Sequence, residues 1–370
     1  MVSKSINKAT NRELTFMTSI LSKDALEVFI RDIFKGAGLN EEDANIISKH
    51  LVLANSRGVE SHGVSRVDIY TKRLDIGITK GSSELQVIKE TPGSLLIDGD
   101  GKIGVVTATK AMRRAVEKAK KNGLAVVAIK NSTHSGMLAD YSMYAAKNDC
   151  ISLNMTNATA SMAPWGGKTG YFGTNPMSYG LPAGKENDII FDMATSVVAR
   201  GKIALAKKNN QNIPIGWAIS KEGKPTSDPH EAYEGLVLPV GGPKGYGLAL
   251  LVDSLSGLFS GAAYGPHVAS LYRDLDKNQN VGNFFLVMRA DLFEDLDAYK
   301  QRTDQMINEI KNLPLAEGYD RIYLPGEIEH NHMVKAQKEG IHLSDAVLND
   351  LIHAAKKYDI DHTSYHMIVN

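Results

Sequence analysis

The change in hydrophobic pattern at Ser94 constrains the fold more than any other feature of this sequence. From that point short apolar runs of strand length alternate with segments of helical periodicity. The pattern predicts strands at 95–97, 124–129 and 151–155, and helices at 105–121 and 137–148. A strand joined to the next strand through a helix places that helix on a face of the sheet. We therefore predict an α/β fold in which helices flank a sheet.

Both ends of the chain are helical in pattern. Apolar residues recur at helical spacing over 22–35 and 40–57 near the start, and over 295–312 and 344–358 near the end. Ser22 and Asn40 are the candidate N-caps of the first two helices. We expect the N-terminal helices and the C-terminal segment 317–370 to pack together as a second subdomain. The predicted organisation is a flexible extension (1–16), a helical N-terminal subdomain with a substrate-binding motif (17–90), an α/β cofactor-binding core (91–316) and a C-terminal helical segment (317–370).

Charge and cysteine content exclude several classes of protein. Lys+Arg and Asp+Glu both total 42, so no basic excess favours nucleic acid or an anionic membrane as a partner. The single cysteine, Cys150, excludes an intrachain disulfide framework and fits a reducing, cytoplasmic compartment. The most apolar stretch, 247–265, is interrupted by Asp253 and three serines, which favours a buried helix over a membrane span.

A glycine-rich turn resembles a dinucleotide fingerprint. Residues 99–104 match G-x-G-x-x-G between a predicted strand and a predicted helix. The fingerprint also needs an acidic residue at the end of the following strand, to hold the ribose 2′-OH. That strand ends in Lys130-Asn131-Ser132, which carries no acid. The residues therefore favour a plain turn and a sheet that is not of the Rossmann type.

Two histidines lie in polar loops and are candidates for proton transfer. His134 follows a predicted strand and precedes a helix, where open α/β sheets place catalytic groups. His62 precedes Arg66 by four residues, so a helical turn would bring an imidazole beside a guanidinium able to grip a carboxylate. The alternatives are a capping or core histidine for His134 and a solvated basic face for His62 and Arg66.

Other polar groups could hold a phosphate, a ribose or a second imidazole. Asp192 closes an apolar strand and could orient a histidine, bind a ribose hydroxyl or cap the next helix. Lys244 lies in a glycine-rich segment before a helix, where free N–H groups favour a diphosphate. Glu327 follows a tight turn at Gly326 and is a weaker ribose candidate. No spacing of His, Cys or acidic residues predicts a metal site.

A non-redox hydrolase or lyase that uses His62 and His134 is the alternative enzyme class. A triad of Ser61, His62 and Asp192 would serve a hydrolase. It is disfavoured because adjacent residues point apart on a helix or strand, which would separate Ser61 from His62.

Several motifs, taken in chain order, resemble one family. They are residues 57–66 (RGVESHGVSR), 134–136 (HSG), 173–176 (GTNP), 192–195 (DMAT) and 241–247 (GGPKGYG). This order resembles the type 2 malate/L-lactate dehydrogenase family, and the ureidoglycolate dehydrogenases within it most closely. One departure is Ala158, which stands where those enzymes carry a cofactor-contacting serine.

The resemblance implies a homodimer with a non-Rossmann fold that transfers hydride between NAD or NADP and a small 2-hydroxy or 2-oxo acid. Malate, lactate, ureidoglycolate and sulfolactate are the candidate substrates. Arg66 would hold the substrate carboxylate. His134 would exchange the proton, or His62 with Ser61 and Asp192 as its relay. The implied cofactor contacts are Asp192, Met193, Ala194, Lys244, Gly326 and Glu327.

Overall fold

The computed structural model describes residues 19–81, 84–361, 363 and 365, so the predicted extension 1–16 lies outside the described residues. The strands are β1 (Ser19–Leu21), β2 (Gln86–Thr91), β3 (Ser94–Asp98), β4 (Leu124–Ser132), β5 (Cys150–Thr156), β6 (Met177–Leu181), β7 (Ile189–Met193), β8 (Ala218–Ile219), β9 (Leu236–Val237), β10 (Val281–Arg289) and β11 (Ile341–Leu343). The α-helices are α1 (Lys23–Gly36), α2 (Glu41–Ser56), α3 (Val67–Asp75), α4 (Gly104–Asn122), α5 (Ala139–Lys147), α6 (Arg200–Lys208), α7 (Pro229–Glu234), α8 (Pro243–Asp253), α9 (Leu296–Lys311), α10 (Glu327–Glu339) and α11 (Asp345–Lys357).

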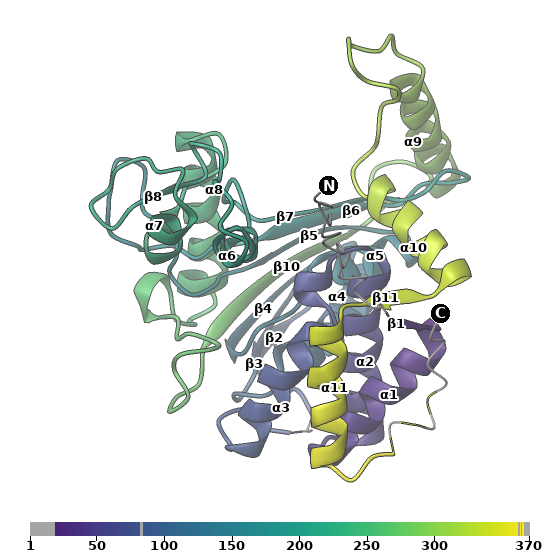
Figure 1. Ribbon diagram of the computed structural model, residues 1–370. Coiled ribbons are helices and arrows are strands. Elements are labelled where there is room, and N and C mark those ends of the chain that lie inside the picture. Colours follow the sequence, from purple (N-terminus) through teal and green to yellow (C-terminus); the bar gives the residue numbers. More distant parts are fainter. Residues whose placement is uncertain (1–18, 82–83, 362, 364, 366–370) are drawn as a thin grey trace, which may run out of the picture.

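A seven-stranded sheet in the order β2-β3-β4-β10-β5-β6-β7 forms the centre of the molecule (Figure 1). Only β3 and β4 pair in parallel, and α4 makes the crossover between them. The other neighbours are antiparallel. Three of these pairs join consecutive strands, and the other two arise because β10 returns from late in the chain and inserts between β4 and β5. The predicted α/β class is confirmed, and the mostly antiparallel pairing distinguishes this sheet from a Rossmann sheet.

The central core lies between α4 and the sheet. One face of α4 buries apolar residues, among them Ala108, Met112 and Ala115, against Val127 of β4 and Phe285 of β10. Alanines on this face let the helix approach the strands closely, and apolar burial drives the contact. The predicted strand–helix–strand unit is therefore present, with boundaries that extend one to three residues beyond the prediction.

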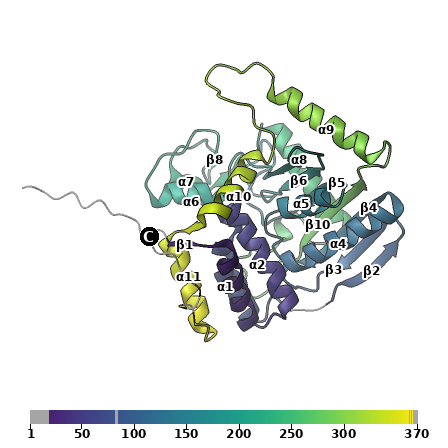
Figure 2. The ribbon, with the colours of Figure 1, turned by 90° about the vertical axis from the view of Figure 1, so that its right-hand side faces the viewer.

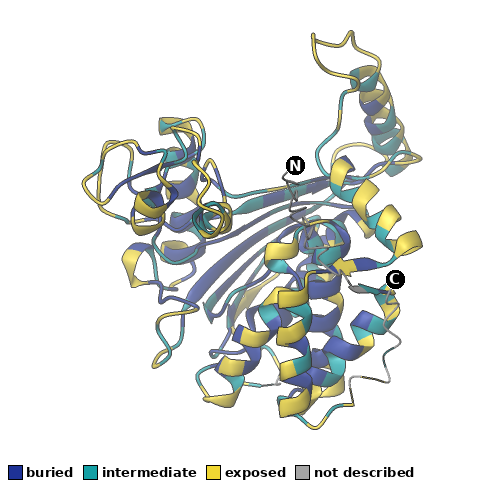
Figure 3. Cartoon of the chain, in the orientation of Figure 1, coloured by how far each residue is buried: buried dark blue, intermediate teal, exposed yellow. Residues whose placement is uncertain are grey.

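The helical ends pack against each other as predicted. Helices α1 and α2 share a core with α11, and β1 pairs with β11, so the two ends of the described chain meet (Figures 1 and 2). The capping residues were also predicted: Ser22 accepts from the Ala25 N–H and Asn40 from the Asp43 N–H. Figure 3 shows the buried faces of these helices beside a largely buried sheet.

The glycine-rich turn 99–104 is filled by protein. The N–H groups of Gly99 and Gly101 donate to the carbonyls of Lys130 and Asn131, and the Gly104 N–H donates to Thr133 Oγ1, each at 2.8 Å. These groups bind the end of the following strand, so they are not free to cradle a pyrophosphate. The prediction of a plain turn agrees with this geometry.

The helix predicted in 247–265 is present, but the prediction that it is buried is wrong for one of its faces. Helix α8 continues into a π-helical turn, Ser254–Phe259. Leu250 and Leu251 are each 45% exposed, Leu258 57% and Phe259 67%. Apolar composition alone cannot distinguish a helix buried in its own chain from one that leaves an apolar face open. No helix among the described residues is long and apolar enough to cross a bilayer.

We expect Gly104→Ala to lower the free energy of unfolding by about 1–3 kcal/mol, the usual cost of overpacking. A Cβ at this position would lie 2.1 Å from the Thr133 carbonyl oxygen, which belongs to the backbone and cannot rotate away. Urea unfolding measures the change. Gly201→Ala in α6 is the matched control, because a Cβ there meets nothing within 4 Å. Equal stability of the two variants would contradict the prediction.

Candidate active site

The two predicted histidine loops meet at one place. His134 lies in the loop between β4 and α5, and His62 lies in one of two short 3₁₀ turns between α2 and α3. Their rings are stacked, with centroids 5.5 Å apart. Two imidazoles from segments some seventy residues apart thus face each other.

His134 is held by its Nδ1 atom. This nitrogen lies 2.6 Å from the hydroxyl of buried Tyr70 and accepts a hydrogen bond from the Gly136 N–H at 3.2 Å. The backbone N–H of His134 donates to Gln279 Oε1. Burial lowers the pKa of His134 well below its ordinary value, and the positive charge of Arg66 lowers it further. His134 is therefore neutral at physiological pH and presents Nε2 away from Tyr70.

His62 is bonded to its neighbour in sequence. Ser61 Oγ lies 3.0 Å from His62 Nδ1. The prediction that these side chains point apart is therefore wrong, because the two residues lie in a 3₁₀ turn and not in a regular helix or strand. Burial lowers the pKa of His62 to about 3, with a further contribution from Arg66.

Arg66 shares the site with both histidines. Its Nε donates to the Ser61 carbonyl at 2.6 Å, and its Nη1 donates to the Tyr272 hydroxyl, whose ring it also faces. Among the described residues no carboxylate pairs with Arg66. A guanidinium that has no counterion beside two neutral imidazoles is suited to a carboxylate ligand.

Asp192, at the end of β7, lies on the far side of the same loop. Its Oδ2 accepts from the Ala139 N–H at 2.7 Å. The side chain of Asp192 is exposed, but the protein around its carboxylate raises its pKa to about 6, while the Ala139 N–H and the charge of Arg57 oppose the rise. Among the described residues Asp192 makes no hydrogen bond to Ser61 or His62, so the suggested relay is not assembled in this conformation.

The predicted cofactor segments converge next to Asp192. The Thr195 N–H donates to the Thr174 carbonyl, and the Val240 N–H donates to the Thr195 carbonyl. These bonds bring the segments 173–176, 192–195 and 240–244 together. Met193 and Ala194 lie in the sequence between Asp192 and the bonded Thr195. Lys244 lies in the first turn of α8, is exposed, and forms no ion pair among the described residues.

Gly326 and Glu327 begin α10 and pack beside β7. The Ile190 N–H donates to the Pro325 carbonyl, and a Cβ at Gly326 would lie 2.4 Å from the Ile190 carbonyl oxygen. Glu327 is buried, and its carboxylate binds Arg321 and accepts from the Leu324 N–H. Its oxygens are thus engaged within the turn.

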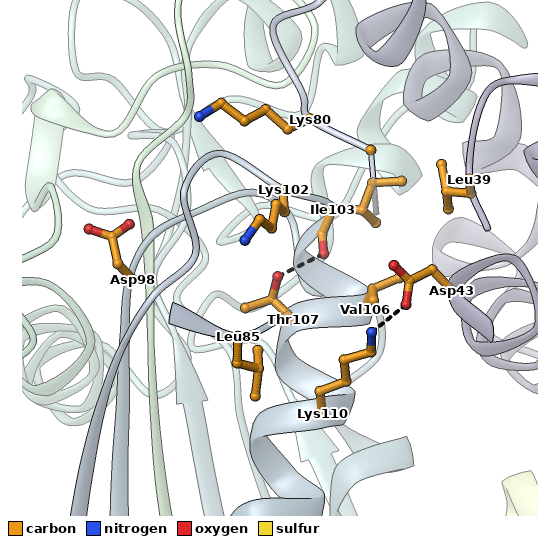
Figure 4. A pocket seen from close by; sticks show the side chains of 11 residues that line it. Leu39, Asp43, Lys80, Leu85, Asp98, Lys102, Ile103, Val106, Thr107 and Lys110 are labelled. Atoms are coloured by element: carbon orange, nitrogen blue, oxygen red, sulfur yellow. Dashed lines mark hydrogen bonds and ion pairs between the residues drawn. The ribbon is translucent and has the colours of Figure 1, made fainter. Parts of the chain in front are cut away.

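A separate pocket lies between α2, α4 and the end of β3 (Figure 4). Three lysines and two aspartates line it, and the close-up shows Lys110 turned toward Asp43, 2.6 Å away. Lys80 pairs with Asp100, and Lys102 donates to the Glu84 carbonyl. Because these cations are engaged within the protein, this pocket is not a candidate for substrate binding. No group of His, Cys, Asp or Glu in the described chain could hold a metal ion.

Several residues of the site were not predicted. His50 of α2 binds the loop of His134, and Tyr272 contacts Arg66. A histidine among the apolar positions of an amphipathic helix was the available signal for His50. Tyr272 and Gln279 belong to a long connection before β10, whose path no local pattern specifies.

Comparisons with known proteins give the family. Residues 21–352 match the family model of malate/L-lactate dehydrogenase. The chain is 37% identical to the malate dehydrogenase of Pyrococcus abyssi over 92% of its own length and 95% of that protein's. It is 35% identical to the ureidoglycolate dehydrogenase (NAD(+)) of Escherichia coli, over 90% of its own length and 95% of that protein's.

A solved structure agrees. The sulfolactate dehydrogenase of Methanocaldococcus jannaschii superposes with a TM-score of 0.88 at 37% identity, covering 94% of this chain and 99% of that one. The chain therefore belongs to the malate/L-lactate dehydrogenase family, whose members are NAD(+)- or NADP(+)-dependent dehydrogenases of small hydroxy acids. The hydrolase or lyase alternative has no support among these relatives. Their similar identities do not single out one substrate.

We expect Asp192→Asn to stabilise the protein more at pH 7.5 than at pH 5. Because the pKa of Asp192 is about 6 in the folded state and ordinarily 3.8, the stability it contributes is lost as the pH rises through 6. Asparagine does not ionise, and its Oδ1 can still accept from the Ala139 N–H. The measurement is the difference in Tm between variant and wild type at the two pH values. A difference that does not change with pH would refute the prediction.

Proposed function

We propose that this protein transfers hydride between NAD(P) and a small 2-hydroxy or 2-oxo acid at the paired histidines. The observation that carries the proposal is the stacked His62–His134 pair beside Arg66, a guanidinium without a carboxylate partner among the described residues. An acid whose carboxylate lies on Arg66 would place its C2 oxygen near the imidazoles. Orientation of this kind is what the protein supplies, since a nicotinamide supplies the hydride chemistry.

His134 is the group that exchanges the proton in this proposal, and His62 is the second candidate. In the reduction of an oxo acid, His134 would give its Nε2 proton to the substrate oxygen while the Tyr70 hydroxyl, 2.6 Å from Nδ1, gives its own proton to Nδ1, so the ring stays neutral. Oxidation of a hydroxy acid would run the same two transfers in reverse. Burial raises the pKa of Tyr70, so its hydroxyl is protonated at physiological pH and has a proton to give, while the positive charge of Arg66 favours its ionised form. A bound carboxylate would offset the charge of Arg66, one of the causes that hold the pKa of both histidines low.

The residues around Asp192 fit a dinucleotide. The first turn of α8 has no side-chain cap, and Gly241 and Gly242 before it adopt positive φ. A Cβ at Gly242 would lie 3.0 Å from the ring of Trp165, so glycine allows the backbone before α8 to lie close to that ring. We propose that Lys244 and the N–H groups of this turn hold the diphosphate, and that Asp192, Met193 and Ala194 contact the cofactor. Gly326 and Glu327 would shape the adjoining wall. A cytoplasmic location is part of the proposal, on the sequence grounds given above.

The first test is thermal unfolding with NADH, with NADPH and with neither. A ligand that binds only the native state stabilises it by about 2.7 kcal/mol at a hundredfold excess over Kd. We expect a rise in Tm with at least one cofactor, and then loss of absorbance at 340 nm with the 2-oxo acid of malate, lactate, ureidoglycolate or sulfolactate. No shift with either cofactor and no turnover would overturn the proposal.

Variants then assign the roles. We expect His134→Asn to lower kcat by about 10²–10⁴ while the cofactor still raises Tm. Arg66→Gln should chiefly raise KM for the oxo acid. If His134→Asn kept normal kcat and His62→Asn lost it, the two histidines would exchange roles.

We also propose a homodimer in which the exposed face of α8 and the π-helical turn is covered by a second copy. Leu250, Leu251, Leu258 and Phe259 form this face, and an apolar patch of this kind marks an interface. The double variant Leu258→Lys, Phe259→Lys should shift the mass measured by light scattering from dimer to monomer. Ile88→Lys, at a 53% exposed position on edge strand β2, is the control that should leave it unchanged. A wild-type protein of monomer mass would contradict the proposal.

A further inference from the structure

The loop that carries His134 is held by side chains from distant parts of the fold. Leu138, the N-cap of α5, makes no side-chain capping bond. The Gly136 N–H donates to His134 Nδ1 at 3.2 Å, the Met137 N–H to His50 Nε2 at 3.0 Å, and the Ala139 N–H to Asp192 Oδ2 at 2.7 Å. Three backbone donors that lack a local cap are thus satisfied by three separate residues.

His50 is the member of this set that the proposed chemistry does not use. It lies on α2 and is 1% exposed. Its Nδ1 lies 2.7 Å from Asp140 Oδ2, while its Nε2 accepts from the Met137 N–H. A nitrogen that accepts from a backbone N–H carries no proton, so the ring proton is on Nδ1 and is donated to Asp140. Both nitrogens are engaged, which fixes the orientation of the ring.

The ring of His50 also shapes the peptide next to His134. Gly136 has φ +70°, and a Cβ at this position would lie 2.1 Å from His50 Nε2. The ring therefore occupies the space that any side chain at 136 would need. Tyr141 holds the preceding residue, since its hydroxyl donates to the Ser135 carbonyl at 2.5 Å. The 135–137 backbone is confined from both sides.

We propose that His50 is a positioning residue for His134. By accepting the Met137 N–H and packing on Gly136, it aims the Gly136 N–H at His134 Nδ1. That bond turns Nδ1 inward, keeps the proton of the neutral ring on Nε2, and presents Nε2 to the ligand. The inference rests on the proposed function in one respect, that Nε2 of His134 faces the substrate oxygen.

Two substitutions separate this role from a merely structural one. In His50→Gln the side-chain oxygen can reach the place of Nε2 and accept the Met137 N–H. In His50→Asn the amide can replace Nδ1 toward Asp140, but nothing reaches Met137. We expect His50→Asn to lower kcat by about 100-fold with little change in KM, the scale of a catalytic group misplaced by about 1 Å. His50→Gln should recover most of the loss.

Ser48→Ala is the matched control. Ser48 is buried on the same helix, and its hydroxyl donates to the Asn45 carbonyl without touching the loop. This variant should keep wild-type kcat. A structural role alone would make kcat follow Tm across all the variants. Equal kcat in His50→Asn and His50→Gln would overturn the proposal.

A second measurement does not need turnover. The ¹⁵N spectrum of the imidazole rings in the wild-type protein should show His134 with a proton on Nε2 only, its signal identified by its absence in His134→Asn. A proton on Nδ1 would overturn the inference. If the wild type reduces no oxo acid with NADH or NADPH but this spectrum is as expected, the proposed function fails and the positioning role stands. In folded His50→Asn the Nε2-only signal should be lost, whereas His50→Gln should keep it.

Discussion

The loop between β4 and α5 is the constraint on which the rest of the site depends. A helix that begins without its own cap leaves backbone N–H groups that must find acceptors. Here the acceptors are a histidine ring in the loop itself, a histidine of α2 and an aspartate of β7. Satisfying these donors therefore joins the N-terminal helices, the sheet and the candidate proton-transfer residue. A change at any of these acceptors would be transmitted to His134 through one short stretch of backbone.

Electrostatics give the site its preference for an anion. Arg66 is largely surrounded by protein and has hydrogen-bond partners but no carboxylate among the described residues. Its charge and the burial of the rings keep His62 and His134 neutral. A carboxylate ligand compensates Arg66, so binding itself would favour protonation of an adjacent imidazole. The contact between the ligand carboxylate and Arg66 would thus increase the affinity for the ligand and also raise the pKa of the neighbouring imidazole.

The sequence predicted those parts of the fold that depend on local pattern. The strand–helix–strand unit and the caps Ser22 and Asn40 were found from residue types and spacing. Local pattern did not predict the Ser61–His62 contact. Adjacent side chains point apart on a regular helix or strand, but in this 3₁₀ turn they form a hydrogen bond. Local pattern was also insufficient for α8, because nothing in an apolar run says which faces the chain itself will cover. Insertion of β10 between β4 and β5 joins segments about 150 residues apart, which no local periodicity reveals.

By itself the sequence determined the class of fold, the membership of the motifs in one family, and the identity of the candidate residues His62, Arg66, His134, Asp192 and Lys244. Only the tertiary structure decided how they work together. It stacked the two imidazoles, placed the Tyr70 hydroxyl beside Nδ1 of His134, and engaged Glu327 within its own turn. It also brought His50 to the loop that carries His134. The reason is that residue type and spacing specify local structure and the available chemistry, whereas hydrogen bonds between distant segments exist only after the chain has folded.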